Sequence, residues 1–530
     1  MNTERHNLNP RDPNHYDVVV LGGAFAGASA ATLLKRWLPE RRVLVVEQTE
    51  NFTKKVGEAT VEISAMFLHR VLGLQDFLSR EQLPKHGLRY WFTDSPDRHL
   101  TEMSEFGPRE TPRLPSFQLD RGKMDTEILR VAAAAGAEVM RPAKVTAVDL
   151  GWPSSRIEIE CDGTRRSVTA RWVIDASGRH AFLARRLRIH HRAEAHPTAA
   201  LWGRWKGVLD LDGQGLLGSD PRNPRIPHLN VARRLATNHF CGWGFWCWVI
   251  PLVGGETSIG VVYDKTLITL PGATPREQYE TFLRTHAGLR DLVAEATFDE
   301  EDFNAYAHLP YSSERFADRG WALVGDAAAF LDPYYSPGLD FVSMSVYASV
   351  RMIEDDLKGK LDDSALGALL DRHNQEFSRS YERWLHALYV GKYKLYGDIE
   401  LTAIALALDT SLYYMGVVTP IVQDLEELRR PLYGKPIPGV TFAFKFMRGY
   451  NRRLQKLADR RRERGIYGRH NVGHRLASTT PGLGSKGLGL LRWGLKMWLK
   501  AEWATFWAGL KPRKRPRPEP VMAPAAPVSG

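Results

Sequence analysis

The stretch that decides the fold lies near the N-terminus and reads Tyr16-Asp17-Val18-Val19-Val20-Leu21-Gly22-Gly23-Ala24-Phe25-Ala26-Gly27. Its apolar run predicts a strand buried on both faces, followed by a tight turn and a helix of small residues. Strand, turn and helix in this order are the context of a dinucleotide-binding fingerprint. Gly22 lets the turn close, and Gly27 lets the helix approach the strand. The N–H groups of the next turn, around Gly23, Ala24 and Ala26, can face a pyrophosphate.

The middle glycine of this fingerprint is replaced by Ala24, which crowds a phosphate by one methyl group. A second apolar strand, 43–46, ends on Glu47, whose carboxylate is placed to hydrogen-bond an adenosine ribose. This acidic residue favours dinucleotide binding over the alternative, a βαβ unit with a purely structural role.

Two further buried strands end in a carboxylate beside a glycine. The first runs into Asp175-Ala176-Ser177-Gly178, and the second into Gly325-Asp326. Because the carboxyl ends of parallel strands meet at one sheet edge, we expect Asp175, Gly178, Gly325 and Asp326 to lie near the bound dinucleotide.

Composition bounds the remaining possibilities. The chain has 530 residues, long enough for two or three lobes, and its three cysteines have no metal or redox spacing, so no metal site is predicted. Residues 1–15 lack the apolar segment of a secretory signal, and no run of about 18 apolar residues indicates a membrane span. We therefore expect a cytoplasmic protein.

The net charge of +11 is concentrated at one end. Residues 451–530 carry 18 Lys/Arg and four Asp/Glu, whereas the other 450 residues are slightly acidic. This distribution argues against nucleic-acid binding by the body of the protein. Residues 488–510 interleave tryptophans with Lys and Arg, which predicts either an interfacial helix on an anionic membrane or a helix docked on the protein itself. The basic segment 511–517 and the tail beyond it are predicted to be disordered.

The central part of the chain reads as β-structure. Alternating patterns between residues 198 and 263 predict an antiparallel sheet beside the nucleotide domain. Trp246 and Trp248 lie on one face of a strand, because strand side chains alternate. They form either a packed aromatic ridge or a pocket wall. Lys85 precedes an aromatic strand, and its residue pattern alone favours a solvated loop lysine.

Taken together, the three strand ends resemble the FAD-contact segments of the group A flavoprotein monooxygenase superfamily, as does the pair Arg121 and Asp125. Two more segments resemble flavin-dependent halogenases within it. These are Trp246-Cys247-Trp248-Val249-Ile250-Pro251 and Gly57-Glu58-Ala59-Thr60. The resemblance covers roughly residues 15–350. It implies FAD contacts at Glu58, Ala59, Arg121 and Asp326, and it aligns Lys85 with the active-site lysine of the family.

The resemblance also implies the chemistry. Reduced FAD, supplied by a separate flavin reductase, uses dioxygen and halide to make hypohalous acid. The lysine then directs this oxidant to an electron-rich carbon of a small-molecule or carrier-bound aromatic substrate. In the family, the tryptophan pair separates flavin from substrate, and a Ser-Thr/Ser-Gly turn binds halide through backbone N–H groups.

The chain departs from the family at that turn, which is Ser336-Pro337-Gly338. Proline has no N–H, so Ser336 and Gly338 must supply the halide site without one expected donor. Tyr335 stands where tryptophan halogenases have a carboxylate, which favours a phenol, pyrrole or aryl-polyene over free tryptophan. The alternative is a halogenase-like FAD monooxygenase or dehydrogenase acting on a lipophilic substrate without halide. A non-enzymatic flavoprotein scaffold is a third possibility.

We therefore predict an α/β fold with a Rossmann-like FAD-binding domain, 15–195 with 310–360. An antiparallel-sheet substrate domain is inserted over 196–309. A helical C-terminal region spans 361–470, and 471–530 comprise a linker, the basic amphipathic helix and the tail.

Overall fold

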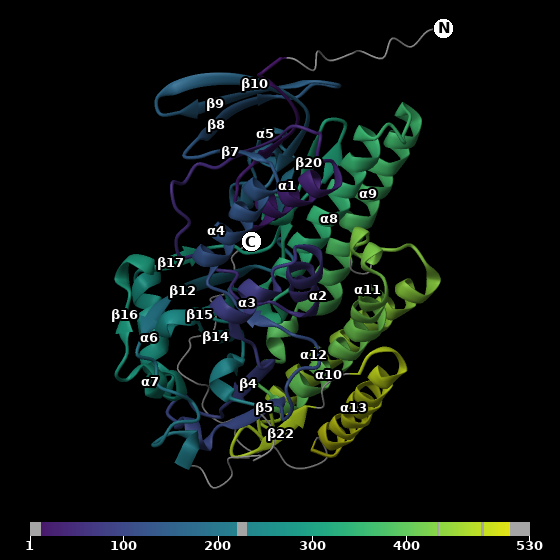
Figure 1. Ribbon diagram of the computed structural model, residues 1–530. Helices are drawn as coiled ribbons and strands as arrows, with labels where there is room; N and C mark the ends of the chain where they lie inside the picture. The colour runs from purple at the N-terminus through teal and green to yellow at the C-terminus, as the bar shows by residue number, and fades with distance from the viewer. Residues whose placement is uncertain (1–11, 220–230, 432–433, 479–481, 509–530) are drawn as a thin grey trace.

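The computed structural model describes residues 12–219, 231–431, 434–478 and 482–508. Two large sheets lie beside a layer of long helices (Figure 1). The first sheet has the order β19-β20-β10-β1-β2-β7, with a hairpin, β8 and β9, extending from β10. Its strands are β1 (His15–Leu21), β2 (Val43–Val46), β7 (Glu138–Met140), β8 (Lys144–Asp149), β9 (Ser155–Cys161), β10 (Thr164–Asp175), β19 (Ala317–Asp318) and β20 (Trp321–Leu323).

The predicted first strand is the centre of this sheet. β1 pairs in parallel with β2 and β10, and the register places Leu21 beside Val46 and Asp175. The parallel strands therefore end at one edge, as expected from their residue patterns. Helices α1 (Phe25–Trp37), α4 (Arg121–Ala134) and α8 (Gly338–Leu357) begin close to this edge and pack on one another through α1. The Rossmann-type arrangement predicted from the sequence is confirmed.

The second sheet is larger and mainly antiparallel. Its order is β16-β12-β15-β14-β13-β4-β5-β22, with β17 paired to β12. The strands are β4 (Leu88–Phe92), β5 (Ser104–Pro108), β12 (Thr198–Lys206), β13 (Thr237–Gly242), β14 (Phe245–Pro251), β15 (Glu256–Asp264), β16 (Thr297–Phe298), β17 (Asn304–Tyr306) and β22 (Arg475–Ser478). The sheet thus recruits β4 and β5 from before residue 196 and β22 from after residue 309. Lys85 is placed by this recruitment, because it lies three residues before the start of β4.

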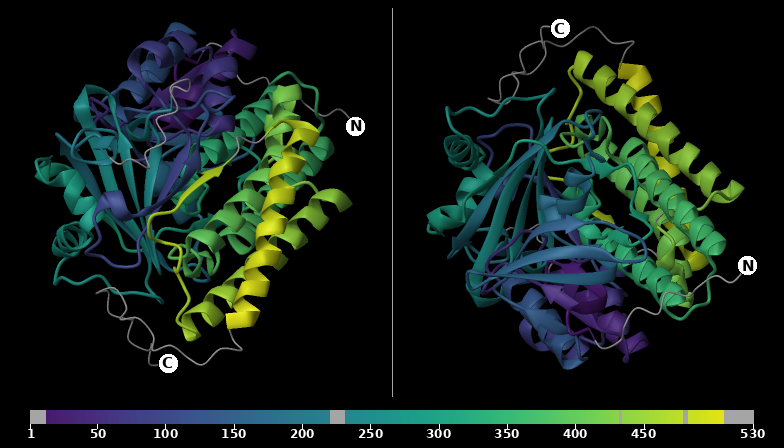
Figure 2. Two further views of the ribbon diagram at one scale, coloured as in Figure 1. Left: turned by 90° about the horizontal axis from the view of Figure 1, so that it is seen from below. Right: turned by 90° about the horizontal axis from the view of Figure 1, so that it is seen from above.

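The C-terminal helices cover one side of this sheet (Figure 2). They are α9 (Asp363–Trp384), α10 (Ile399–Tyr413), α11 (Thr419–Gln423), α12 (Pro438–Glu463) and α13 (Leu488–Ala508). The run Ile399–Gln423 is apolar and long enough to cross a membrane, but 72% of it is buried inside the protein. We therefore describe it as a core helix.

Helix α13 lies along the outer side of this layer and packs mainly against α10 (Figure 2). Gly494 allows the close approach, because a Cβ there would stand 2.8 Å from the Leu408 side chain. Arg453 fixes the helix from α12 through hydrogen bonds to Glu502 of 2.6 and 2.7 Å. Of the two alternatives for this segment, docking on the protein body is therefore realised. The basic residues 511–517 lie outside the described residues.

Candidate active site

The turn after β1 has no room for side chains at two of its glycines. A Cβ at Gly27 would lie 1.8 Å from the Gly22 carbonyl oxygen, and one at Gly22 would lie 2.7 Å from the Ala176 carbonyl oxygen. Gly22 also has a φ of +97°, a conformation that favours glycine. The first hydrogen bond of α1 runs from the Ala28 N–H to the Ala24 carbonyl. The N–H groups before Ala28 are therefore directed beyond the helix end, as an anion site requires.

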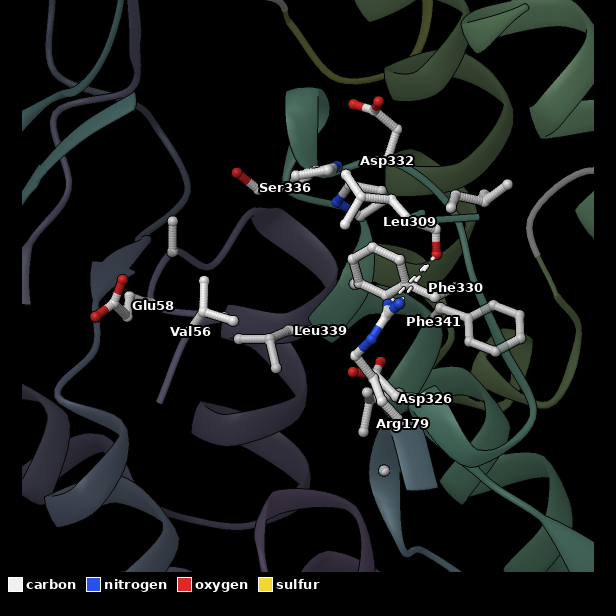
Figure 3. A pocket seen from close by; sticks show the side chains of 18 of the residues that line it. Val56, Glu58, Arg179, Leu309, Asp326, Phe330, Asp332, Ser336, Leu339 and Phe341 are labelled. Atoms are coloured by element: carbon white, nitrogen blue, oxygen red, sulfur yellow. Dashed lines mark hydrogen bonds between the residues drawn. The ribbon is translucent and has the colours of Figure 1, made fainter. Parts of the chain in front are cut away.

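A cavity of about 270 Å³ opens in front of this turn, between the two sheets. Figure 3 shows Glu58 and Val56 on one side of it and Asp326 and Arg179 on the other. Most of the sequence-predicted cofactor residues line it. They are Ala24, Ala26, Glu58, Ala59, Arg121, Gly178, Asp326 and Gly338, together with Ser336, Trp246 and Trp248.

The other predicted cofactor residues support the cavity from behind. Glu47 accepts hydrogen bonds from the Gly23 N–H at 2.7 Å and from Thr49 at 2.8 Å, so it fixes the turn. Asp175 accepts the N–H groups of Ser177 and Leu183 and orders the loop after β10. Neither side chain lines the cavity. Their contact with a cofactor stays a prediction, as does that of Gly325, whose N–H donates to Ser345 Oγ at 2.9 Å.

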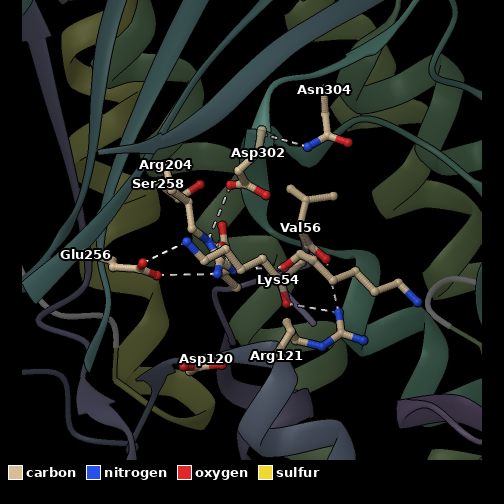
Figure 4. A network of polar contacts seen from close by, with 12 residues as sticks. Lys54, Val56, Asp120, Arg121, Arg204, Glu256, Ser258, Asp302 and Asn304 are labelled. Atoms are coloured by element: carbon tan, nitrogen blue, oxygen red, sulfur yellow. Dashed lines mark hydrogen bonds and ion pairs between the residues drawn. The ribbon is translucent and has the colours of Figure 1, made fainter. Parts of the chain in front are cut away.

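Arg121 and Glu58 hold the loop that forms one wall of the cavity. Figure 4 shows Arg121 beside Val56 of this loop. Arg121 binds Asp125 through two hydrogen bonds of 3.1 Å and donates to the carbonyl groups of Val56 and Gly57. Glu58 is buried against Arg204, whose Nη2 lies 2.7 Å from its Oε1. Burial raises the pKa of Glu58, and the Arg204 guanidinium opposes that rise. Sequence reasoning missed Arg204, because its partner lies 146 residues away.

Asp326 provides the test of whether FAD fits. Burial raises the pKa of this carboxyl group, and Arg179 opposes the rise. Among the described residues, no group donates a hydrogen bond to its carboxylate, although it faces the cavity. A ribityl or ribose hydroxyl supplies such a donor. The side chains that line this cavity, the free helix N-terminus and the glycine turn therefore fit FAD.

Trp246 and Trp248 form part of the cavity wall, which decides between the two interpretations of this pair. Their ring centroids lie 5.8 Å apart. The indole N–H of Trp246 donates to Tyr393, whose hydroxyl donates in turn to Asp332 at 2.7 Å. Asp332 is buried and also meets the His196 ring at 3.0 Å. This chain of polar contacts was missed, because no local pattern connects its members.

A second cavity, of about 180 Å³, adjoins the first. Rings and aliphatic side chains form most of its wall, and Lys85, Glu62, Asp340 and Asp409 are its charged residues. The wall also includes Tyr90, Phe106, Tyr335, Trp384, Leu388, Leu406, Tyr413, Tyr414 and Leu490. Neither Trp246 nor Trp248 lines it, so the separation of the two compartments by this pair stays a prediction. The residues common to both cavities are Pro337 and Trp384.

An aromatic stack connects the walls of the two cavities. His239 lines the first cavity and Tyr90 the second, and their ring centroids are 4.8 Å apart with planes at 21°. Burial lowers the pKa of His239 to about 3, so its imidazole is neutral near pH 7. These two stacked rings are therefore an uncharged contact between the walls of the two cavities.

Lys85 is buried, not solvated as its local pattern indicates. Its side chain is 3% exposed, and its Nζ donates to the Thr60 carbonyl at 2.8 Å. Burial lowers the pKa of Lys85 to about 8, opposed by the charges of Glu62 and Asp340. Its ammonium group therefore loses a proton more readily than an exposed lysine.

Tyr335 connects the second cavity to a buried ion pair. Its hydroxyl donates to Asp409 at 2.6 Å, and Asp409 also binds the buried ammonium of Lys392. A carboxylate from α10 thus lies next to the position where tryptophan halogenases carry their own. The tyrosine at this position is therefore in direct contact with a buried carboxylate.

The turn at 335–338 lies between the two cavities. The Ser336 N–H donates to the Pro333 carbonyl at 2.9 Å, and Pro337 has no N–H. Among the described residues, no acceptor is found for the N–H groups of Gly338 and Leu339, which begin α8. A Cβ at Gly338 would meet only the Phe330 ring, at 3.9 Å. A small anion here would therefore depend on the first N–H groups of α8.

A match to a family model identifies the family of this chain. The model of the tryptophan halogenase family matches residues 17–112 and 110–394, most of the length. The chain belongs to the tryptophan halogenase family. The chain is similar to the flavin-dependent halogenase chlA of Dictyostelium discoideum, with 28% identity over 66% of this chain and 62% of that protein. The chain thus spans less than two thirds of that relative.

Two further comparisons concern a second relative and a solved structure. The 1H-pyrrole-2-carbonyl-[peptidyl-carrier protein] chlorinase of Pseudomonas fluorescens is 27% identical over 61% of this chain and 72% of its own. The structure of halogenase PltM in complex with phloroglucinol and FAD superposes with a TM-score of 0.68 over 91% of this chain and 96% of that one. At 16% identity, this superposition shows a common fold.

Proposed function

We propose that the protein binds FAD in the first cavity and halogenates an electron-rich aromatic compound in the second. The observation that carries the proposal is Lys85, a buried lysine in an apolar cavity that meets the cofactor cavity at Pro337. Bound and reduced FAD supplies, with dioxygen, the oxidising equivalent that turns halide into hypohalous acid. Glu58, Arg121 and Asp326 hold the cofactor, and Lys85 positions the oxidant through its N–H groups.

The lining of the second cavity supports an uncharged aromatic substrate. Three carboxylates, Glu62, Asp340 and Asp409, face it, so a substrate carboxylate would meet like charge. Tyrosine and phenylalanine rings offer stacking surfaces. We propose a phenol, pyrrole or aryl-polyene group, free or attached to a carrier protein. A separate flavin reductase would deliver the reduced cofactor.

The deciding experiment combines purified protein, FAD, a flavin reductase and a panel of phenols and pyrroles with chloride or bromide. Mass spectrometry of the products should show halogen incorporation that depends on the added halide. Oxygenated or desaturated products that form without halide would establish the alternative, an FAD monooxygenase or dehydrogenase. Pro337 is the observation that favours this alternative.

Restoring the missing donor tests the halide site. The variant Pro337→Thr adds an N–H beside those of Gly338 and Leu339. A charge-assisted hydrogen bond contributes about 1.5–3 kcal/mol, so apparent halide affinity should rise about tenfold or more. A bromide and chloride titration of product formation measures the change, and bromide should be preferred in the parent because it is desolvated more easily. An unchanged halide dependence would mean that halide binds elsewhere.

We also propose that α13 holds the protein at an anionic membrane surface. Its inward side chains Leu490, Ala501 and Thr505 are buried, whereas Leu499, Trp503 and Phe506 are more than 60% exposed. Arg492, Lys496 and Lys500 follow the same outward side, and five more basic residues occur in 511–517. Exposed aromatic residues beside basic ones are typical of interfacial helices.

Sedimentation with vesicles of phosphatidylglycerol tests this surface. A fully buried Leu or Phe contributes about 1.5–3 kcal/mol, so Leu499→Ser with Phe506→Ser should weaken binding at least tenfold. Salt should weaken it further by screening the basic residues.

Leu187→Ser, at an exposed leucine of the first domain, is the matched control and should bind like the parent. Equal binding by all variants, or binding to neutral vesicles alone, would contradict the proposal. Deleting 485–530 is a poorer test, because Leu490 lines the second cavity.

A further inference from the structure

We infer that Asp340 accepts the proton that the aromatic ring loses when its carbon–halogen bond forms. The inference rests on the proposed function and adds to it a second reacting residue. Asp340 stands two residues after the halide-turn glycine, in the first turn of α8, and its side chain reaches the second cavity. It is 1% exposed, so the side chain meets the substrate space and not bulk water.

Two donors from different elements fix the Asp340 carboxylate. Its Oδ1 accepts the N–H of Ser64 in α2 (Glu62–Met66) at 2.8 Å. Its Oδ2 accepts the hydroxyl of Tyr413 at the end of α10, also at 2.8 Å. A carboxylate oxygen has a further lone pair after one hydrogen bond, so Oδ2 retains the capacity to accept a proton.

The three carboxylates of the cavity are not equivalent. Asp409 is paired with the Lys392 ammonium and also accepts the hydroxyls of Tyr335 and Tyr450. These three donors occupy lone pairs of its carboxylate. Asp340 has no cation within 4 Å among the described residues, although Lys85 lines the same cavity and the two charges interact.

The environment gives Asp340 the basicity for this step. Burial raises its pKa to about 7, while the donors Ser64 and Tyr413 oppose the rise and the nearby charge of Glu62 adds to it. A general base is most effective when its pKa lies near the working pH. Glu62 faces the same cavity, but its carboxylate accepts the Tyr414 hydroxyl and lies on a partly exposed residue.

The step balances with hypohalous acid as the oxidant, which the proposed function supplies. A pair of ring electrons forms the carbon–halogen bond, and the halogen–oxygen bond breaks. The oxygen leaves as water after taking a proton from the Lys85 ammonium. The ring carbon's C–H bond then breaks, its electrons restore the aromatic ring, and its proton passes to Asp340. Return of that proton to Lys85 restores both groups.

Asp340→Asn tests the inference, because asparagine keeps an acceptor for the Ser64 N–H but cannot take up a proton. The probe is 4-ethylphenol carrying deuterium ortho to its hydroxyl, with bromide, FAD and a flavin reductase. The parent should brominate it without a ring isotope effect, since proton loss is fast. The variant should be slower by on the order of 10²-fold and should show a normal primary isotope effect.

Bromination by Asp340→Asn at the parent rate, with no isotope effect, would overturn the inference and leave the proposed function standing. Absence of brominated product from the parent itself would instead overturn the proposed function. FAD content, measured by absorbance after desalting, shows whether the variant is correctly assembled.

A second variant keeps the inference testable if Asp340→Asn does not fold. Tyr413→Phe removes a donor that stabilises the Asp340 carboxylate, so the pKa of Asp340 should rise further above its ordinary value. At low pH, where Asp340 is protonated, proton loss limits the bromination rate, so the rate rises with pH as this base ionises, and this rising limb should move from near pH 7 to higher pH. Tyr16→Phe removes a hydroxyl that donates to Glu138 in the first sheet, away from this cavity, and should leave that limb in place. Equal pH profiles for both variants and the parent would contradict the role of Asp340.

Discussion

Replacing Lys85 with alanine should abolish halogenated product while FAD stays bound. The Lys85 side chain is buried in the second cavity, where its ammonium donates to the Thr60 carbonyl. Alanine removes the group that binds and polarises the oxidant, but Lys85 does not line the cofactor cavity. Product mass, flavin content and the rate of flavin reoxidation by dioxygen measure the three properties separately.

Two controls sharpen the Lys85 result. Lys85→Met retains most of the side-chain volume, so it separates loss of the ammonium from loss of packing and should be equally inactive. Lys206→Ala removes a lysine whose side chain is 69% exposed and should halogenate like the parent. A halogenating Lys85→Ala variant would return this residue to a structural role.

Gly27→Val should release FAD and destabilise the fold. A Cβ at this position would stand 1.8 Å from the Gly22 carbonyl oxygen and 3.0 Å from the Val20 side chain, so β1 and α1 must separate. Their separation would open the turn that receives the pyrophosphate. Flavin absorbance after desalting should fall to background, and the melting temperature should drop by several degrees, since core overpacking costs about 1–3 kcal/mol.

The matched control for Gly27 is Gly449→Ala, in the interior of α12. A Cβ at Gly449 meets nothing within 4 Å, and alanine favours helix by up to about 1 kcal/mol. This variant should retain FAD and the parent stability. Retention of stoichiometric FAD by Gly27→Val would refute the assignment of this turn to the cofactor.

The sequence predicted those parts of the site that are encoded locally. β1, its glycine turn and α1 are contiguous, and strand alternation alone places Trp246 and Trp248 on one face. The carboxylates at strand ends were placed at the correct sheet edge. Their individual roles were less predictable, because Glu47 and Asp175 turn toward backbone N–H groups behind the cavity.

The partners of the buried charges were not predictable from the sequence. Asp340 meets Ser64 across 276 residues and Tyr413 across 73, and no spacing rule connects them. The burial of Lys85 was likewise not predictable from its neighbours in the sequence. Its own neighbours predict exposure, whereas its ammonium is bound by the Thr60 carbonyl, 25 residues earlier in the chain. The resemblance to a family identified it where the residue pattern did not.

Residues from distant parts of the chain line the second cavity. Lys85 belongs to the part of the chain that the tryptophan halogenase model matches. Tyr413, Tyr414 and Leu490 lie beyond residue 394, where that match ends. Part of the wall of the proposed substrate cavity is thus encoded outside the stretch that the family model matches. On the proposed function, we expect substitutions at Tyr414 or Leu490 to change which aromatic compounds bind, and neither residue lines the cofactor cavity.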